Sequence, residues 1–346
     1  MSHGPLVIAG RQVQPGSHAR VDVPLPCLYT QTSVFMPVHV VHGQRPGPRL
    51  VVTAAVHGDE INGVEIIRRL LQQRALAHVR GTLLAVPVVN VYGYIRQSRY
   101  LPDRRDLNRC FPGSDRGSLA ARLAATLVRE VLDGATHGID LHTGALHREN
   151  LAQVRVSLNT DARLTPLAQA FATPIILDAE VRPGSLRAVA AARNIPMIIY
   201  EGGEALRFDE VAIRAGLRGV LGVMRHLGMI PERSRRAPSK PPLVARSSLW
   251  VRANQSGVLL SLAQLGASVK KDDTLGIISD PFRPADEAVT APDDGILIGR
   301  TNLPLITEGE ALYHIARIGN RDTATGQTGD DRHILDPEDE LNQSIV

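Results

Sequence analysis

The stretch "LVVTAAVHGDEINGVEIIRRL", residues 50–70, decides the fold. It begins as an almost unbroken apolar run, which is typical of a strand buried in a parallel sheet. After His57 the apolar residues recur with the spacing of an amphipathic helix. A buried strand that leads into a helix indicates an α/β unit, and it places His57, Asp59 and Glu60 at the junction.

The same alternation of strand and helix continues through the first two thirds of the chain. Apolar runs that predict strands are separated by segments with helical periodicity, and the last of these ends near Gly228. We expect strands within residues 50–56, 81–90, 137–142, 174–179 and 196–203, and helices within residues 62–76, 117–135, 160–172 and 208–228. This order predicts an α/β domain with a largely parallel sheet flanked by helices.

A second, smaller domain is expected because 346 residues exceed the usual size of one core. A proline-rich, charged segment suits an exposed linker, and after it two similar stretches each predict strand, turn and strand. We expect N-terminal strands (1–46) joined to a main domain (47–230), a linker (231–242), a C-terminal β-domain (243–318) and a polar tail (319–346). The composition of the tail is typical of disordered segments.

Composition and charge narrow the functional class. The apolar fraction is 43% and the formal net charge is +4. No apolar run approaches the roughly 20 residues that span a bilayer, and the N-terminus does not resemble a signal peptide. Basic residues are interspersed with acids, unlike the basic and aromatic surfaces that bind nucleic acid. We therefore expect a cytoplasmic protein with no membrane or nucleic-acid partner, and the sequence leaves homo-oligomer formation open.

Polar residues gather at the predicted strand ends, where ligands of open α/β sheets bind. The Gly58-Asp59 corner lets His57 and Glu60 converge, and His142 ends another predicted strand. Two histidines and one carboxylate suit a catalytic zinc, with bonds of roughly 2.0–2.2 Å and an open fourth position. A glutamate in a first helical turn can also simply favour the helix dipole. The joint occurrence of all three residues at strand ends favours the metal, and leaves Asp59 as a helix cap.

With those residues in place, the chain resembles the succinylglutamate desuccinylase/aspartoacylase family, a branch of the zinc-carboxypeptidase-like fold. Four motifs over roughly residues 45–228 carry the resemblance: "HGDE" (57–60), "RYLPDRRDLNRCFPG" (99–113), "DLH" (140–142) and a glutamate that ends a late strand. The order "HG-x-E" then "DLNR-x-FPG" is the specific part. The resemblance implies a mixed sheet flanked by helices, with a smaller C-terminal all-β domain that is barrel-sandwich-like.

The family pattern also implies the metal and its ligands. Carried over by position, His57, Glu60 and His142 resemble the ligands of one Zn²⁺ per chain. Asp106, which opens "DLNR", resembles the carboxylate that orients the first zinc histidine through its other ring nitrogen. The alternative for Asp106 is a helix or turn cap. Arg155 follows His142 along the chain, and its contact with substrate is left open.

The remaining functional positions follow from the same resemblance. Asn108 and Arg109 resemble the pair that grips the substrate carboxylate, for which an arginine fork is well suited; a structural salt bridge is the alternative for Arg109. Arg99 resembles the arginine that faces the oxyanion, although other arginines are close in sequence. Glu201 resembles the general base, and its place at a strand end favours it over Glu204.

The C-terminal repeat resembles the β-domain of this family and, more distantly, the biotinyl and lipoyl domains. The segment between its two halves, residues 279–294, contains no lysine, so we expect no attached biotin or lipoyl group.

The resulting hypothesis is a zinc-dependent deacylase that hydrolyses a linear amide C–N bond in a small, carboxylate-bearing N-acyl amino acid. One alternative keeps the metal but takes short peptides as substrate, as a metallocarboxypeptidase does. The other is a non-catalytic binding protein of the same fold.

Overall fold

The computed structural model describes residues 4–232 and 241–318. By its internal contacts the chain divides into two units, Met1–Val244 and Ala245–Val346. Most of the predicted linker (233–240) and the predicted tail (319–346) lie outside the described residues. Each unit is described below by itself.

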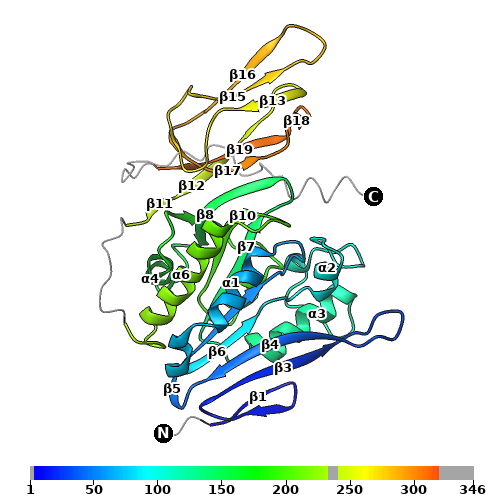
Figure 1. Ribbon diagram of the computed structural model, residues 1–346, viewed down its shortest axis with the longest axis vertical. Helices are drawn as coiled ribbons and strands as arrows, with labels where there is room; N and C mark the ends of the chain where they lie inside the picture. Colours follow the sequence, from blue (N-terminus) through cyan, green and yellow to red (C-terminus); the bar gives the residue numbers. More distant parts are fainter. Residues whose placement is uncertain (1–3, 233–240, 319–346) are drawn as a thin grey trace. The chain divides into compact units, whose positions relative to one another are not determined.

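The first unit is built on a mixed sheet with the strand order β9-β8-β10-β7-β5-β6-β4-β3 (Figure 1). Strands β10, β7, β5 and β6 run parallel, whereas β8 is antiparallel to β10, and β4 to β6. The strands are β3 (Ser17–Leu25), β4 (Val34–His42), β5 (Arg45–Ala54), β6 (Arg80–Val86), β7 (His137–Gly144), β8 (Arg148–Val156), β9 (Ile175–Asp178) and β10 (Met197–Glu204). A separate hairpin pairs β1 (Leu6–Ile8) with β2 (Arg11–Val13).

This sheet confirms the predicted fold class, but it is less parallel than expected. The N-terminal strands β3 and β4 pair over nine residues and extend the sheet. Strand β8 was not predicted, because Gln153 and Arg155 interrupt the continuous apolar run that marks the predicted strands.

Helices cover both faces of this sheet. Figure 1 shows α1, α4 and α6 together on one face, where their apolar side chains share a core with the sheet. Side chains of α3 and α5 belong to a separate core on the other face. The helices are α1 (Asn62–Leu71), α2 (Val91–Ile95), α3 (Leu119–Leu127), α4 (Leu164–Phe171), α5 (Leu186–Ala192) and α6 (Glu210–His226), with 3₁₀ turns at Arg74–His78 and Leu107–Arg109 and a π-helical turn at Val128–Leu132. In the described part of the chain, no helix is long and apolar enough to cross a membrane.

The alternation along β5 shows how the sheet separates its two faces. Leu50 and Val52 enter the core beneath α1, whereas Val51 enters the core beneath α3. Thr53 has the same parity as Val51 and is completely buried. We call the side of the sheet that Val51 and Thr53 share the α3–α5 face, and the candidate site lies on it.

The second unit consists of antiparallel strands in two similar halves. The short strand of each half pairs with a long strand of the other half, β14 with β17 and β18 with β13. The strands are β12 (Ser247–Arg252), β13 (Gly257–Ser261), β14 (Ser268–Val269), β15 (Thr274–Ser279), β16 (Asp286–Thr290), β17 (Gly295–Thr301), β18 (Leu305–Ile306) and β19 (Ala311–Arg317), and β11 (Leu243–Ala245) lies at the boundary between the units. This all-β architecture agrees with the predicted repeat.

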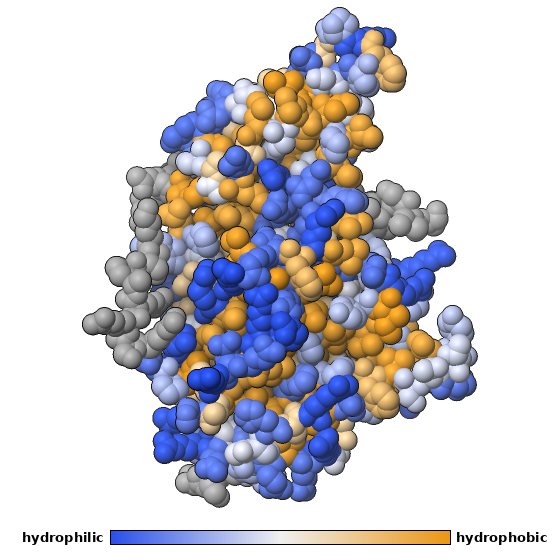
Figure 2. All heavy atoms as spheres, in the orientation of Figure 1, coloured by the Kyte–Doolittle hydropathy of each residue, from blue (hydrophilic) through white to orange (hydrophobic). Residues whose placement is uncertain are grey.

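The second unit also exposes apolar side chains. Figure 2 shows hydrophobic residues on the surface over β13 and β18, where Leu260 and Leu305 are 60% and 72% exposed.

Candidate metal centre

Three buried side chains converge at the carboxyl ends of β5 and β7. His57 follows β5, Glu60 lies three residues later, and His142 belongs to β7. Their potential ligand atoms all lie within 4.8 Å of one another. The structure therefore brings together the three residues that the sequence suggested as metal ligands.

Each imidazole is oriented by a carboxylate on its far side. The Nδ1 atoms of His57 and His142 lie 2.7 and 2.8 Å from the carboxylate oxygens of Glu60. The Nε2 of His57 lies 3.1 Å from Asp106, and the Nε2 of His142 lies 2.8 Å from Asp140. When Nε2 donates to a carboxylate, the lone pair of Nδ1 is left for a metal. Both Nδ1 atoms thus face the same small space beside Glu60.

Arg99 lies against this cluster rather than apart from it. Its Nη1 is 3.3 Å from Glu60 Oε1, and its Nη2 is 3.0 Å from Asp106 Oδ2. The sequence could not choose between Arg99 and its neighbours, and the structure places Arg99 beside two members of the centre.

The buried charges strongly affect one another. Burial and Arg99 both act to lower the pKa of His57, but Glu60 and Asp106 outweigh them and raise it to about 9. Burial alone would raise the pKa of Asp106, yet His57 and Arg99 hold it well below its usual range. The pKa of Glu60 is lowered in the same way by the two histidines, against its burial. The cluster therefore keeps the carboxylates of Glu60 and Asp106 ionised, and a carboxylate that binds a metal must be ionised.

The backbone corner between His57 and Glu60 depends on close approach. A Cβ at Gly58 would lie 2.1 Å from the backbone carbon of Gly93, so a side chain there has no room. Helix α1 begins only at Asn62, so Glu60 lies in the preceding turn and not in the first helical turn.

The expectation that Asp59 caps α1 is wrong. The N-cap position is Ile61, and no side chain caps this helix. Asp59 Oδ1 is buried without a hydrogen-bond partner among the described residues, and burial together with Glu60 raises the pKa of Asp59 to about 6. Asp59 lies two residues before the N-cap position of α1.

Glu201 occupies the strand position beside His142. The two residues are register partners in the parallel strands β10 and β7, so their side chains leave the sheet on the same face. Asn150 Nδ2 donates to Glu201 Oε2 over 3.1 Å. Glu204, the alternative base, instead accepts a hydrogen bond from the His147 backbone.

Asn108 and Arg109 follow Asp106 in the short 3₁₀ turn. Asp106 accepts the Asn108 backbone N–H over 2.7 Å, so the carboxylate beside His57 also caps this turn. Asn108 Oδ1 accepts a hydrogen bond from the Leu186 backbone, which directs its NH₂ group elsewhere. Arg109 Nη1 donates to the Asn108 carbonyl. The Asp106 side chain therefore does both things that the sequence suggested: it caps the turn and it contacts His57.

Two residues of the centre had received no role from the sequence. Asp140 lies two positions before His142 in β7, and its Oδ1 accepts a 2.6 Å hydrogen bond from Thr53 Oγ1. Thr53 and Asp140 are register partners in neighbouring strands, and both are almost completely buried. The signal was present in "DLH", because alternate residues of a strand share one face.

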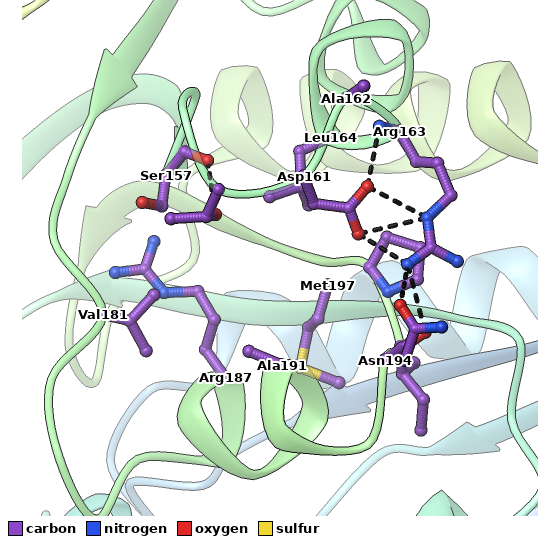
Figure 3. Close-up of a pocket in the computed structure, with 13 residues that line it drawn as sticks. Ser157, Asp161, Ala162, Arg163, Leu164, Val181, Arg187, Ala191, Asn194 and Met197 are labelled. Carbon is purple, nitrogen blue, oxygen red and sulfur yellow. Dashed lines mark hydrogen bonds and ion pairs between the residues drawn. The ribbon is translucent and has the colours of Figure 1, made fainter.

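A third missed residue, Arg187, lies on α5. It is 8% exposed, and its Nε and Nη1 have no hydrogen-bond partner among the described residues. Burial, followed by Arg155 and Arg182, lowers the pKa of Arg187 to about 10, so it remains charged at neutral pH. Arg187 lines a hollow of about 400 Å³ beside α5 (Figure 3). Helix α5 was not predicted, because its run of alanines gives only a weak apolar pattern.

Comparison with known proteins bears on this geometry. The profile of the succinylglutamate desuccinylase/aspartoacylase catalytic domain matches residues 46–227. The chain belongs to this family. The predicted resemblance is thereby confirmed, and membership supports placing the chain among the hydrolases that remove acyl groups.

Individual proteins that are similar to this chain agree with a place among the deacylases. The N-alpha-acetyl-L-2,4-diaminobutyric acid deacetylase of Halomonas elongata is 26% identical over 300 residues, covering 83% of this chain and 86% of that protein. A succinylglutamate desuccinylase/aspartoacylase structure from Rhodobacter sphaeroides has a TM-score of 0.76 at 25% identity, covering 86% of this chain and 95% of that one. The product-bound ectoine utilization protein EutE (DoeB) from Ruegeria pomeroyi has a TM-score of 0.76 at 23% identity, covering 86% and 94%, and shows the shared fold.

Proposed function

We propose that this protein is a zinc-dependent amidohydrolase that removes the acyl group from a small N-acyl amino acid. The observation that carries the proposal is the convergence of His57 Nδ1, His142 Nδ1 and the Glu60 carboxylate within 4.8 Å. Each ring is also oriented by its own carboxylate.

The donor set fits zinc. Two imidazole nitrogens and one carboxylate oxygen are the ligands of many catalytic zinc sites, which keep a further position for water or substrate. Zinc bound by His57, Glu60 and His142 would lower the pKa of a bound water to about 7 and polarise the amide carbonyl.

The remaining roles belong to the side chains around this centre. The Glu201 carboxylate takes the proton of the attacking water and later gives it to the leaving nitrogen. Its position beside His142 on the α3–α5 face supports this role. The guanidinium of Arg99 stabilises the negative oxygen of the tetrahedral intermediate, and its contacts with Glu60 and Asp106 support this placement.

Asn108 and Arg109 hold the carboxylate of the substrate. Because Asn108 Oδ1 already accepts from Leu186, its side chain presents the NH₂ group as a donor. Arg109 supplies charged N–H donors beside the Asn108 side chain, and its Nη1 donates a hydrogen bond to the Asn108 carbonyl. An amide donor next to a guanidinium favours a carboxylate. The relative from Halomonas elongata, named as a deacetylase of an N-acetylated amino acid, supports this substrate class.

The decisive experiment compares two glutamates. In zinc-loaded protein, Glu201→Gln should keep the metal and lose turnover of N-acetyl amino acids by about 10²–10⁴-fold, which is the usual contribution of a general base. Glu204→Gln is the matched control and should retain most turnover, because Glu204 contacts the His147 backbone. Full activity in Glu201→Gln, or turnover of short peptides but not of N-acyl amino acids, would contradict the proposal.

A further inference from the structure

Glu201, the proposed base, forms an ion pair with Arg155, a residue that has no role in the reaction proposed above. Arg155 Nη1 lies 3.4 Å from Glu201 Oε1, and both side chains are largely buried, at 22% and 13% exposure. Arg155 is the β8 partner of Ile199 in β10, two residues before Glu201. The two side chains are therefore diagonal neighbours on the α3–α5 face.

Arg155 also has an N–H group that meets no acceptor in the described part of the chain. Its Nε is buried and has no hydrogen-bond partner among the described residues. Leaving a charged donor buried and unpaired is costly, by about 1–3 kcal/mol or more. Such a donor is therefore expected to meet a ligand atom.

Arg187 repeats this feature from the facing helix. Its Nε and Nη1 are likewise buried and unpartnered among the described residues, while its Nη2 donates to the Glu180 carbonyl. The charges that act on Arg187 include Arg155 and Glu201, so the two guanidinium groups and the base belong to one neighbourhood. Unsatisfied cationic donors from β8 and α5 thus lie within electrostatic range of Glu201, and Arg155 contacts it directly, which favours an anionic ligand over a cationic one.

We propose that Arg155 is shared between base and substrate: an anionic group of the substrate binds Arg155, with Arg187 beside it, and thereby frees Glu201 Oε1. This inference rests on the proposed function. Before substrate binds, Arg155 holds one oxygen of Glu201 and Asn150 holds the other. A neutral substrate leaves the ion pair closed, so Arg155 is a specificity-determining residue.

Competition for Arg155 can be measured without turnover. Four forms of the full chain with equal zinc content are titrated with succinate: wild type, Glu201→Gln, Arg155→Met and the double variant. Succinamide is the uncharged match. We expect Glu201→Gln to bind succinate about tenfold more tightly than wild type, within the range of coupled neighbours. This gain should be absent in the Arg155→Met background and should persist with Arg155→Lys, which keeps the charge and guards against misfolding of the methionine variant.

Two results would overturn the inference. One is a Glu201→Gln protein that binds succinate no more tightly than wild type. The other is an equal gain with and without Arg155, which would show a general effect of removing one negative charge. Because these titrations need no catalysis, they decide the inference even if the amide substrate class is wrong.

Kinetics separate the specificity role from a structural one. N-acetylglutamate is compared with N-acetylglutamine, which lacks the side-chain carboxylate, and with the α-amide of N-acetylglutamate, which lacks the α-carboxylate. The amide whose KM differs from that of the acid only when Arg155 is present identifies the carboxylate that Arg155 binds. Arg155→Met should raise KM about tenfold for the acid, whereas kcat for the matching amide should increase, because Glu201 is no longer held in the ion pair. Arg214→Met on the exposed side of α6 is the control and should change neither. Equal loss of activity on acid and amide would assign Arg155 a structural role instead.

Discussion

His142 and its carboxylate Asp140 lie two residues apart in one strand, whereas His57 and its carboxylate Asp106 lie 49 residues apart in two loops. We call these pairs the strand side and the loop side of the centre. The strand side is set by the alternation of β7 and by the sheet that holds it. The loop side forms only when the segment that carries Arg99 and Asp106 folds back over His57.

The difference has a chemical consequence. On the strand side, Asp140 contacts Thr53 and His142 within a rigid parallel sheet. On the loop side, Asp106 binds His57, Arg99 and the Asn108 backbone together. The strand side therefore holds one proposed metal ligand, whereas the loop side also positions the groups that we propose act on substrate.

Removing either histidine should have the largest effect and should not distinguish the two sides. His57→Ala and His142→Ala each delete one of the three proposed zinc ligands, so purified protein should lose stoichiometric zinc on dialysis. Elemental analysis measures this loss. His78→Ala, which changes an exposed residue, should keep the metal. Retention of one zinc per chain in either ligand variant would refute the centre.

Removing the charge of Asp106 or of Asp140 should have different effects on the two sides of the centre. Asp106→Asn and Asp140→Asn should each weaken zinc binding by about 10–100-fold, as expected for groups that orient metal-bound histidines. We expect Asp106→Asn to lower turnover further, because it also removes the ion pair with Arg99. Competition with a zinc chelator gives the affinity, and turnover at saturating zinc gives the second effect. Equal turnover in the two zinc-saturated variants would contradict the distinction.

Substitution of Thr53 tests whether the hydrogen bond behind Asp140 also supports the strand side. Thr53→Val keeps the shape of the side chain but removes the 2.6 Å hydrogen bond to buried Asp140. We expect a loss of about 1–3 kcal/mol in the free energy of unfolding, with a smaller reduction of zinc affinity than in Asp140→Asn. Thr53→Ser should recover most of both. Chemical denaturation and chelator competition measure these quantities, and a valine variant as stable as the serine variant would exclude a role for the hydroxyl.

The smallest effect is expected on α1, outside the centre. Hydrogen bonds from Arg68 and then Arg69 lower the pKa of Glu65 to about 2, from an ordinary value of 4.5. The carboxylate therefore stabilises the fold above about pH 4.5, and this contribution is lost as the pH falls towards 2. Glu65→Gln should destabilise the protein by about 0.5–1 kcal/mol at pH 7. The difference in denaturation midpoint should shrink as the pH falls from 4.5, and a difference that grows there would contradict the assignment.

Local patterns explain which parts of the fold could be predicted. The run 50–56 and the helix after it follow directly from hydrophobic periodicity, and so does β7 with His142. Strand β8 was missed because Gln153 and Arg155 interrupt its apolar run, and helix α5 was missed because it is short and rich in alanine.

The candidate site shows the same division. His57, Glu60 and His142 could be proposed from their places at strand ends, and the family resemblance added Asp106, Asn108, Arg109, Arg99 and Glu201. The contact of Arg155 with Glu201 depends on the register of β8 against β10, which no local pattern contains. The expected role of Asp59 failed because α1 begins only at Asn62, and the sequence does not fix the first residue of the helix.

The central claim is that one zinc is held through the Nδ1 atoms of both histidines together with Glu60. A crystal structure of the zinc-loaded protein, with anomalous data collected on both sides of the zinc edge, tests it most directly. The account predicts a single peak bonded to His57 Nδ1, His142 Nδ1 and the Glu60 carboxylate, with both Nε2 atoms still on Asp106 and Asp140. No peak at this position, or a zinc bound through the Nε2 atoms, would contradict it.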